Sequence, residues 1–114
     1  MSIELLEWVM RQIKHPPIDQ IELTDIMYAF ADPTRIEIIR QLVENDRPMT
    51  CGELNLNRPK SSMSHHFKIL REAGVLETTI EGKEHLNTLR LNDVNEKFPN
   101  LLCVLLEIIN KSAV

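Results

Sequence analysis

Apolar residues recur every three or four positions along most of the chain, and prolines or capping residues separate the runs. An amphipathic helix is predicted over residues 2–14, and Pro16 and Pro17 end it. A second helix is predicted to begin near Asp19, because Asp19 and Glu22 have the spacing of a capping pair. The chain therefore opens with two short helical segments.

Asp32 followed by Pro33 predicts the start of a third helix, since aspartate caps free backbone N–H groups and proline suits the first helical position. This helix is expected to end at residues 45–48, where the sequence is Asn-Asp-Arg-Pro. Thr50 and Glu53 have the spacing of a capping box and predict a short helix of about two turns.

The next helix is predicted to start at Ser61 or Ser62, either of which can act as its cap, and to end at Gly74. Its apolar residues Met63, Phe67 and Leu70 have helical spacing. They are the candidate core face of this helix.

The hydrophobic period then changes from helical to two. Residues 75–80 and 84–91 are rich in Thr, Leu, Val and Ile, and residues 81–82 (Glu-Gly) supply a turn, so the pair predicts a β-hairpin. Asp93 begins another capping pair and introduces a C-terminal helix, in which regular structure is delayed by Pro99.

A short helix, a tight turn, a capped helix and a two-stranded hairpin follow one another in this order. That order predicts a mainly α fold with a small β-hairpin wing, the winged helix-turn-helix. In such a unit the second helix enters the major groove of DNA, which is wide enough to accept a helix.

Composition agrees with one globular domain over residues 1–114. The net charge is −4 with a pI of about 5.5, and 43% hydrophobic with 26% charged residues is ordinary for a folded domain. No apolar run approaches the roughly 20 residues of a membrane span, early glutamates argue against a signal peptide, and two cysteines are too few for a disulfide scaffold. We expect a cytoplasmic protein.

Enzyme chemistry finds no support in the motifs. The three glycines stand far apart, no two histidines have zinc-ligand spacing on a helix, and no Ser or Cys lies in a nucleophile-elbow setting. We therefore expect a binding module without a cofactor or a metal, rather than an enzyme.

Charge is distributed unevenly along the chain. Residues 1–57 carry −5 and residues 72–114 carry −3, whereas residues 58–71 contain four basic residues and no acid. A local basic patch is what phosphate binding requires, and small hydroxyl and imidazole groups on the first turns of a helix can reach base edges. The candidate phosphate ligands are Arg58, Lys60, Lys68 and Lys83, with Arg71 at the edge; the candidate base contacts are Ser61, Ser62, Ser64 and His65.

Two segments carry a resemblance to a known family. Residues 31–39 (ADPTRIEII) and 64–76 (SHHFKILREAGVL) closely resemble the ArsR-type (arsenic-repressor-like) winged-helix regulators, and the resemblance spans roughly residues 20–106. It implies a homodimeric repressor that binds an inverted-repeat DNA operator and is released by a small effector. It also implies that Ser61, Ser62, Ser64, His65 and Lys68 lie on the DNA-reading face. The alternative is a winged helix used as a protein-interaction module.

The two terminal helices are apolar on more than one side, which indicates burial against several neighbours. Either they pack into the core of their own chain or, as the resemblance implies, they form the dimer interface. The candidate interface residues are Leu5, Trp8, Val9, Leu101, Leu102, Leu105, Ile108 and Ile109.

The effector is not identified by the sequence. Family members often sense metals through a Cys-x-Cys motif or through His and Asp on the last helix, but this chain has Cys51 alone and no histidine on its last helix. Cys51 and Cys103 are either a pair of redox thiols or inert buried groups. An organic molecule in an apolar pocket near the dimer interface is the remaining alternative.

Overall fold

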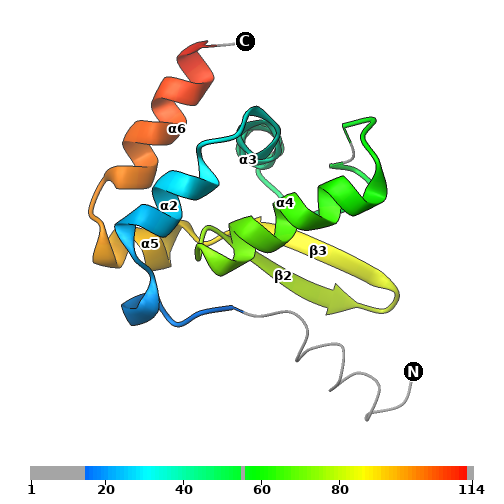
Figure 1. The fold of residues 1–114 in the computed structure, drawn as a ribbon, viewed down its shortest axis with the longest axis horizontal. Helices are drawn as coiled ribbons and strands as arrows, with labels where there is room; N and C mark the ends of the chain where they lie inside the picture. The colour runs from blue at the N-terminus through cyan, green and yellow to red at the C-terminus, as the bar shows by residue number, and fades with distance from the viewer. Residues whose placement is uncertain (1–14, 55, 113–114) are drawn as a thin grey trace.

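A computed structural model describes residues 15–54 and 56–112 and shows the predicted winged helix-turn-helix (Figure 1). The predicted helix over residues 2–14, with Leu5, Trp8 and Val9, lies outside the described residues. The elements are, in order, η1 (Ile18–Gln20), α2 (Leu23–Ala29), α3 (Pro33–Asn45), β1 (Met49–Thr50), α4 (Lys60–Glu72), β2 (Leu76–Glu81), β3 (Glu84–Leu89), α5 (Leu91–Lys97) and α6 (Leu101–Ser112).

The hairpin that forms the wing lies alongside α4. In Figure 1 the hairpin of β2 and β3 runs beneath α4, and its turn lies at the same end of the molecule as the beginning of α4. Helix α6 lies at the opposite end. The core between these elements is apolar, and its fully buried side chains include Ile26, Ile38, Leu70, Val75 and Val94. None of the described helices is long and apolar enough to cross a membrane.

The capped start of α3 is confirmed. The Asp32 carboxylate accepts hydrogen bonds from the backbone N–H of Thr34 at 2.8 Å and of Arg35 at 3.3 Å, and Pro33 is the first helical residue. The helix ends as expected at Asn45, because Asp46 adopts a left-handed conformation with φ 48°.

The end of α4 is also as predicted. Gly74 follows the C-cap with φ +78°, its N–H donates to the Arg71 carbonyl, and the Val75 N–H donates to the Leu70 carbonyl. These two bonds form a Schellman motif, which turns the chain sharply out of the helix. A Cβ at position 74 would also collide with the buried Ile21 side chain, so glycine is required here for space as well as conformation. The motif therefore sets the direction from α4 into the wing.

Two predicted helix starts are wrong. The α2 cap is Glu22, in a capping box with Asp25, because residues 18–20 form a separate 3-10 turn that uses Asp19. The cap of α4 is Pro59 rather than Ser61 or Ser62, which lie inside the helix. In each case a neighbouring residue with the right backbone conformation takes the cap position from the predicted one.

The short helix predicted after Thr50 is only a hydrogen-bonded turn over residues 51–54. The predicted capping box does form: the Thr50 N–H donates to the Glu53 carboxylate at 3.0 Å, and the Glu53 N–H donates to Thr50 Oγ1 at 3.1 Å. The Leu54 N–H reaches the Thr50 carbonyl at 3.1 Å, and Leu54 is fully buried. One turn is enough to bury this leucine and begin the approach to α4.

The C-terminal region contains two helices where one was predicted. Asp93 lies inside α5, where its carboxylate binds the Arg90 side chain at 3.1 Å, and Arg90 is the cap residue. Pro99 and the left-handed Asn100 (φ 66°) separate α5 from α6. The prediction that regular helix is delayed by Pro99 holds for α6.

The hairpin is confirmed, with its turn at Gly82 and Lys83 rather than at residues 81–82. A third strand that the sequence did not reveal, β1, pairs with β3 in the order β1-β3-β2. Buried Asn87 joins all three strands, because it accepts from Thr78 Oγ1 at 2.7 Å and donates to the Met49 carbonyl at 3.1 Å. This pairing anchors the base of the wing.

Candidate nucleic-acid interface

Helix α4 exposes one polar stripe and buries the opposite face. Ser61, Ser64, His65 and Lys68 are exposed, and their spacing of three, one and three residues keeps them on one side of the helix. The predicted core residues Met63, Phe67 and Leu70 are buried on the other side. The helix therefore offers hydroxyl, imidazole and ammonium groups together on one open face.

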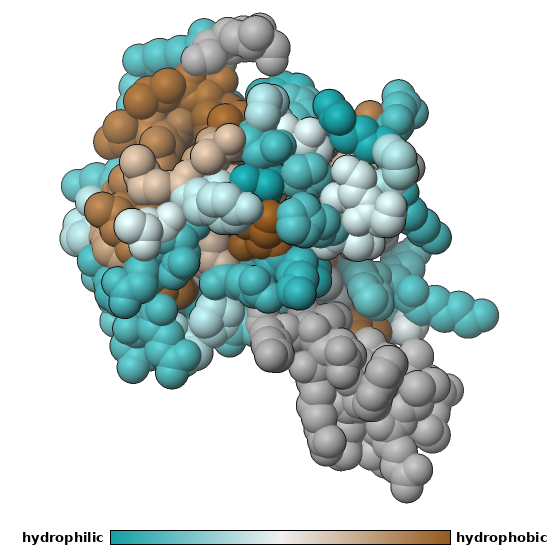
Figure 2. Space-filling model, viewed as in Figure 1, coloured by the Kyte–Doolittle hydropathy of each residue, from teal (hydrophilic) through white to brown (hydrophobic). Residues whose placement is uncertain are grey.

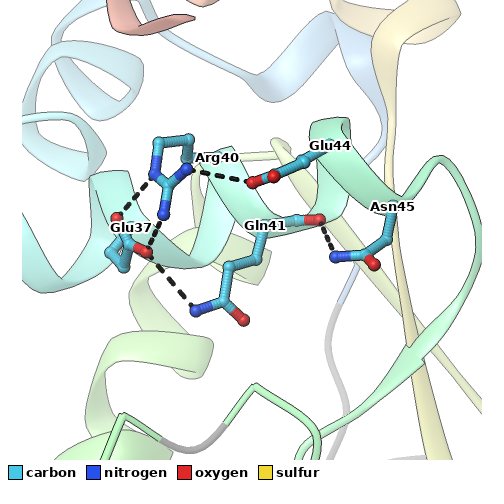
Figure 3. Close-up of polar contacts among 5 residues, drawn as sticks. All are labelled: Glu37, Arg40, Gln41, Glu44 and Asn45. Atoms are coloured by element: carbon cyan, nitrogen blue, oxygen red, sulfur yellow. Dashed lines mark hydrogen bonds and ion pairs between the residues drawn. The ribbon is translucent and has the colours of Figure 1, made fainter. Parts of the chain in front are cut away.

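Arg40 and Arg47, which lie outside α4, are neutralised by acids. Figure 3 shows Arg40 of α3 between Glu37 and Glu44, both of which accept its hydrogen bonds. Arg47 binds Glu53 in the same way, at 2.6 Å. These arginines already have carboxylate partners, so they are poor candidates for phosphate ligands.

The lysines of α4 differ from those arginines. In the described part of the chain no carboxylate lies within ion-pair distance of Lys60, and Lys68 approaches Glu72 only to 4.0 Å with both side chains largely exposed. An exposed pair at that distance contributes little to stability. Both ammonium groups are thus available to an external anion.

The remaining predicted DNA contacts lie around this stripe. Arg58 and Lys83 are exposed, Lys83 in the turn of the wing at the same end of the molecule as the start of α4 (Figure 1). Ser62 and Arg71 are half-buried on the two flanks of the helix. Burial lowers the pKa of Arg71, and Cys51 and Glu72 are near enough to oppose that shift. The structure therefore does not bring Arg71 into the exposed stripe.

Arg35 braces α4 against the preceding helices, a role that sequence reasoning missed. It is 5% exposed. Its guanidinium donates from Nε to the Ala29 carbonyl and from Nη2 to the Tyr28 carbonyl, both at 2.9 Å. Its Nη1 lies 3.2 Å from His66 Nδ1 on α4. One side chain thus joins the end of α2, the start of α3 and the middle of α4. The only sequence signal was an arginine just after a helix cap.

The adjacent histidines of α4 have different environments. His65 is exposed, whereas the His66 side chain is only 12% exposed and packs beside Arg35. Burial lowers the pKa of His66, Asp32 at 4.0 Å opposes the shift, and Arg35 adds to it. His66 is therefore held neutral and accepts the Arg35 hydrogen bond, which leaves His65 as the histidine that faces outward.

The amino-acid sequence is similar to those of known transcriptional regulators. A family model described as a helix-turn-helix domain matches residues 30–79. The HTH-type transcriptional regulator YceK of Bacillus subtilis is 35% identical over 86 residues, which cover 74% of this chain and 85% of YceK. The transcriptional repressor SdpR of the same organism is 36% identical over 76 residues, or 62% of this chain and 82% of SdpR.

The fold is also similar to that of a solved transcriptional regulator. An ArsR-like transcriptional regulator from Rhodococcus sp. RHA1 superposes with a TM-score of 0.58 at 22% identity, over 80% of this chain and 86% of that structure. The chain belongs to the HTH-type transcriptional regulators, and its fold is that of the ArsR-like winged-helix proteins. The resemblance in residues 31–39 and 64–76 is thereby confirmed. This HTH-type protein is a DNA-binding transcriptional regulator, and its relatives favour that function over a protein-interaction module.

Both cysteines of this HTH-type regulator are free thiols. Cys51 is half-buried, and its sulfur accepts a hydrogen bond from Asn87 Nδ2 at 3.4 Å, whereas Cys103 is exposed on α6. Within residues 15–54 and 56–112, no three His, Cys, Asp or Glu side chains are grouped to hold a metal ion.

Helix α6 carries the described half of the predicted dimer interface. Leu102 is 2% exposed and belongs to the core of its own chain, and Leu101 and Leu105 are half-buried against it. Ile109 is half-buried as well. Ile108 is 55% exposed, next to Val104 at 50%. Figure 2 shows the apolar surface that gathers over this helix.

Acidification is expected to destabilise this HTH-type regulator through its two partly buried histidines. Burial lowers the pKa of both His15 and His66 below 6.5, so the unfolded chain binds protons at a higher pH than the native chain does. The free energy of unfolding is therefore highest above about pH 6.5 and falls as the pH drops through the native values. Urea denaturation at about pH 7.5 and 5.5 measures this fall. His66→Asn should reduce it, and His85→Asn, at an exposed position, is the matched control; equal falls in both variants would contradict the assignment.

Proposed function

We propose that this regulator is a repressor that binds an inverted-repeat operator as a homodimer, with α4 in the major groove. The observation that carries the proposal is the exposed stripe of Ser61, Ser64, His65 and Lys68, on a helix where the carboxylate nearest to a lysine is the exposed Glu72, 4.0 Å from Lys68. Helices of this kind dock by their first turns, where small side chains let the backbone approach the bases. The family relative SdpR is itself named a transcriptional repressor.

The position of each side chain on α4 or the wing suggests which part of the DNA it would contact. Arg58, Lys60 and Lys68 would anchor phosphates beside the groove, with Lys83 approaching from the wing. Ser61, Ser64 and His65 would face base edges. Ser62 and Arg71 are half-buried, so they would contribute at the margin of the footprint.

The direct test compares two DNAs in fluorescence-anisotropy binding: the region upstream of the protein's own gene and a scrambled duplex. A repressor of its own gene should prefer the upstream DNA by about a thousandfold, with a steep salt dependence. No binding to either duplex at low salt would overturn the proposal and favour a protein-interaction module.

His65→Ala should then reduce the preference for specific DNA. Loss of a base contact costs about 1–3 kcal/mol in each half-site, so in the proposed dimer the ratio of the two affinities should fall by about 30-fold or more. His85→Ala removes an exposed histidine from the wing, where contacts are expected to go to the backbone only, and should leave the ratio unchanged. An unchanged ratio in His65→Ala would remove this residue from the base-reading set.

The homodimer is proposed from the exposed apolar stripe on α6. Leu101, Val104 and Ile108 are three or four residues apart and lie on one side of the helix, and two of them are at least half exposed. A stable dimer buries about 800 Å² on each partner, so α6 would supply the apolar centre of a larger surface. A two-fold dimer also explains how one small domain would recognise a full operator.

Ile108→Glu should therefore shift the protein from dimer to monomer in sedimentation velocity, because it places a charge in the centre of the proposed interface. Asn110→Glu adds the same charge to an exposed polar position of the same helix and should leave the dimer intact. Dimers of equal strength in both variants would show that α6 does not form the interface.

A groove between the start of α3 and α6 supports release of the DNA by a small organic effector. The groove measures about 560 Å³, with an apolar lining that includes Phe30, Pro33, Ile36 and Ile109. Its size suits a small organic molecule. It lies beside the proposed interface, so an occupant could alter how two α4 helices are spaced.

A further inference from the structure

The tip of the wing holds two opposed acids. In the hairpin register Glu81 pairs directly with Glu84, on either side of the turn formed by Gly82 and Lys83, and all four residues are exposed. Among the described residues, no hydrogen bond or ion pair involves the side chain of Glu81, Lys83 or Glu84. Like charges directly opposite each other destabilise a strand pair, so the local fold gains nothing from this arrangement.

The position of the wing tip would bring the carboxylates of Glu81 and Glu84 close to bound DNA. The turn lies at the end of the molecule where α4 begins, which is the end that would approach the duplex (Figure 1). Residues 81–84 carry two acids and one base, so Lys83 is outweighed. Duplex DNA presents about one negative charge per 1.7 Å, and at physiological salt a charge acts over about 8 Å. A wing that docks beside the backbone therefore brings like charges together.

We propose that the wing tip is a repulsive element that limits DNA affinity, with Glu81 and Glu84 acting against the phosphates. This inference rests on the proposed docking of α4. The repulsion does not depend on sequence, so it opposes the equally sequence-independent attraction of the lysines and keeps binding to random DNA weak. Binding then depends on the base contacts of α4, and the wing tip on balance restrains affinity, because its two acids outweigh the contact that Lys83 would make.

The test replaces both acids by their neutral isosteres. Glu81→Gln with Glu84→Gln should tighten binding to upstream and scrambled DNA by about 5- to 10-fold at about 50 mM salt, and the gain should shrink at about 200 mM as screening increases. Glu77→Gln is the matched control, because Glu77 is exposed on the same strand and face but four residues, or about 13 Å, from the tip. It should leave both affinities unchanged.

The outcomes separate this inference from the proposed function. If the double variant binds as the parent does, or more weakly, while loss of the α4 lysines abolishes affinity, the wing inference is overturned and the docking of α4 stands. If Glu77→Gln tightens binding as much as the tip variant does, the effect belongs to net charge and not to the wing. If no variant binds DNA at low salt, the proposed docking itself fails.

Discussion

Arg35→Met is expected to lower the free energy of unfolding by about 3–5 kcal/mol. The side chain is buried and its guanidinium satisfies the Tyr28 and Ala29 carbonyls and the ring nitrogen of His66. Methionine fills similar volume but donates nothing, so the Ala29 carbonyl and the His66 ring nitrogen lose their partner at about 1–3 kcal/mol each, whereas the Tyr28 carbonyl keeps the Ala31 N–H. Urea denaturation at neutral pH measures the loss, which is a large share of the stability of a small domain.

Arg40→Met is the matched control. Arg40 is five residues further along the same helix, but it and its partners Glu37 and Glu44 are accessible to solvent, so its loss should cost far less than the loss of Arg35. Similar losses in the two variants would show that the charge of α3, and not the brace to α4, is what stabilises the fold. Arg35→Met should also weaken DNA binding more than Arg40→Met does, since His66 loses its partner.

Local sequence rules predicted the fold where one residue decides the geometry. Asp32 before Pro33 leaves few alternatives for the chain, and Gly74 can adopt a left-handed conformation in a space that any Cβ would fill. The period-two pattern also located the hairpin, because both strands are six residues long.

The same rules failed where contacts between residues far apart in the sequence determine the local structure. Strand β1 has two residues, too few for any period, and it exists because Asn87 from β3 binds the Met49 carbonyl. The helix expected after Thr50 stops after one turn, although its capping box forms. Capping bonds are local, but helix length depends on packing that the sequence pattern does not reveal.

The candidate site was predicted in outline only. The cluster of basic residues without acids pointed to α4, and helical spacing places Ser61, Ser64, His65 and Lys68 together. Arg71 belongs to the same basic cluster yet is half-buried beside Cys51, because charge along a sequence does not say which side of a helix is covered. Arg35 was missed for the opposite reason: a buried arginine looks like any surface arginine in a sequence.

Lys60→Ala with Lys68→Ala is expected to weaken DNA binding on the order of 10⁴-fold at about 50 mM salt. In the proposed dimer the two substitutions remove four phosphate contacts, and each contact releases about 0.9 of a counterion, so the slope of log K against log salt should become shallower by about 3.6. Anisotropy titrations over about 50–200 mM salt measure both quantities. The affinities for upstream and for scrambled DNA should fall equally, because phosphates carry no sequence information.

Lys111→Ala, on α6 at the other end of the molecule (Figure 1), removes a positive charge that is paired with Glu107 and should change neither the affinity nor the slope. A slope equal to that of the parent in the double variant would mean that these lysines do not contact phosphates, and that the exposed face of α4 binds something other than the DNA backbone.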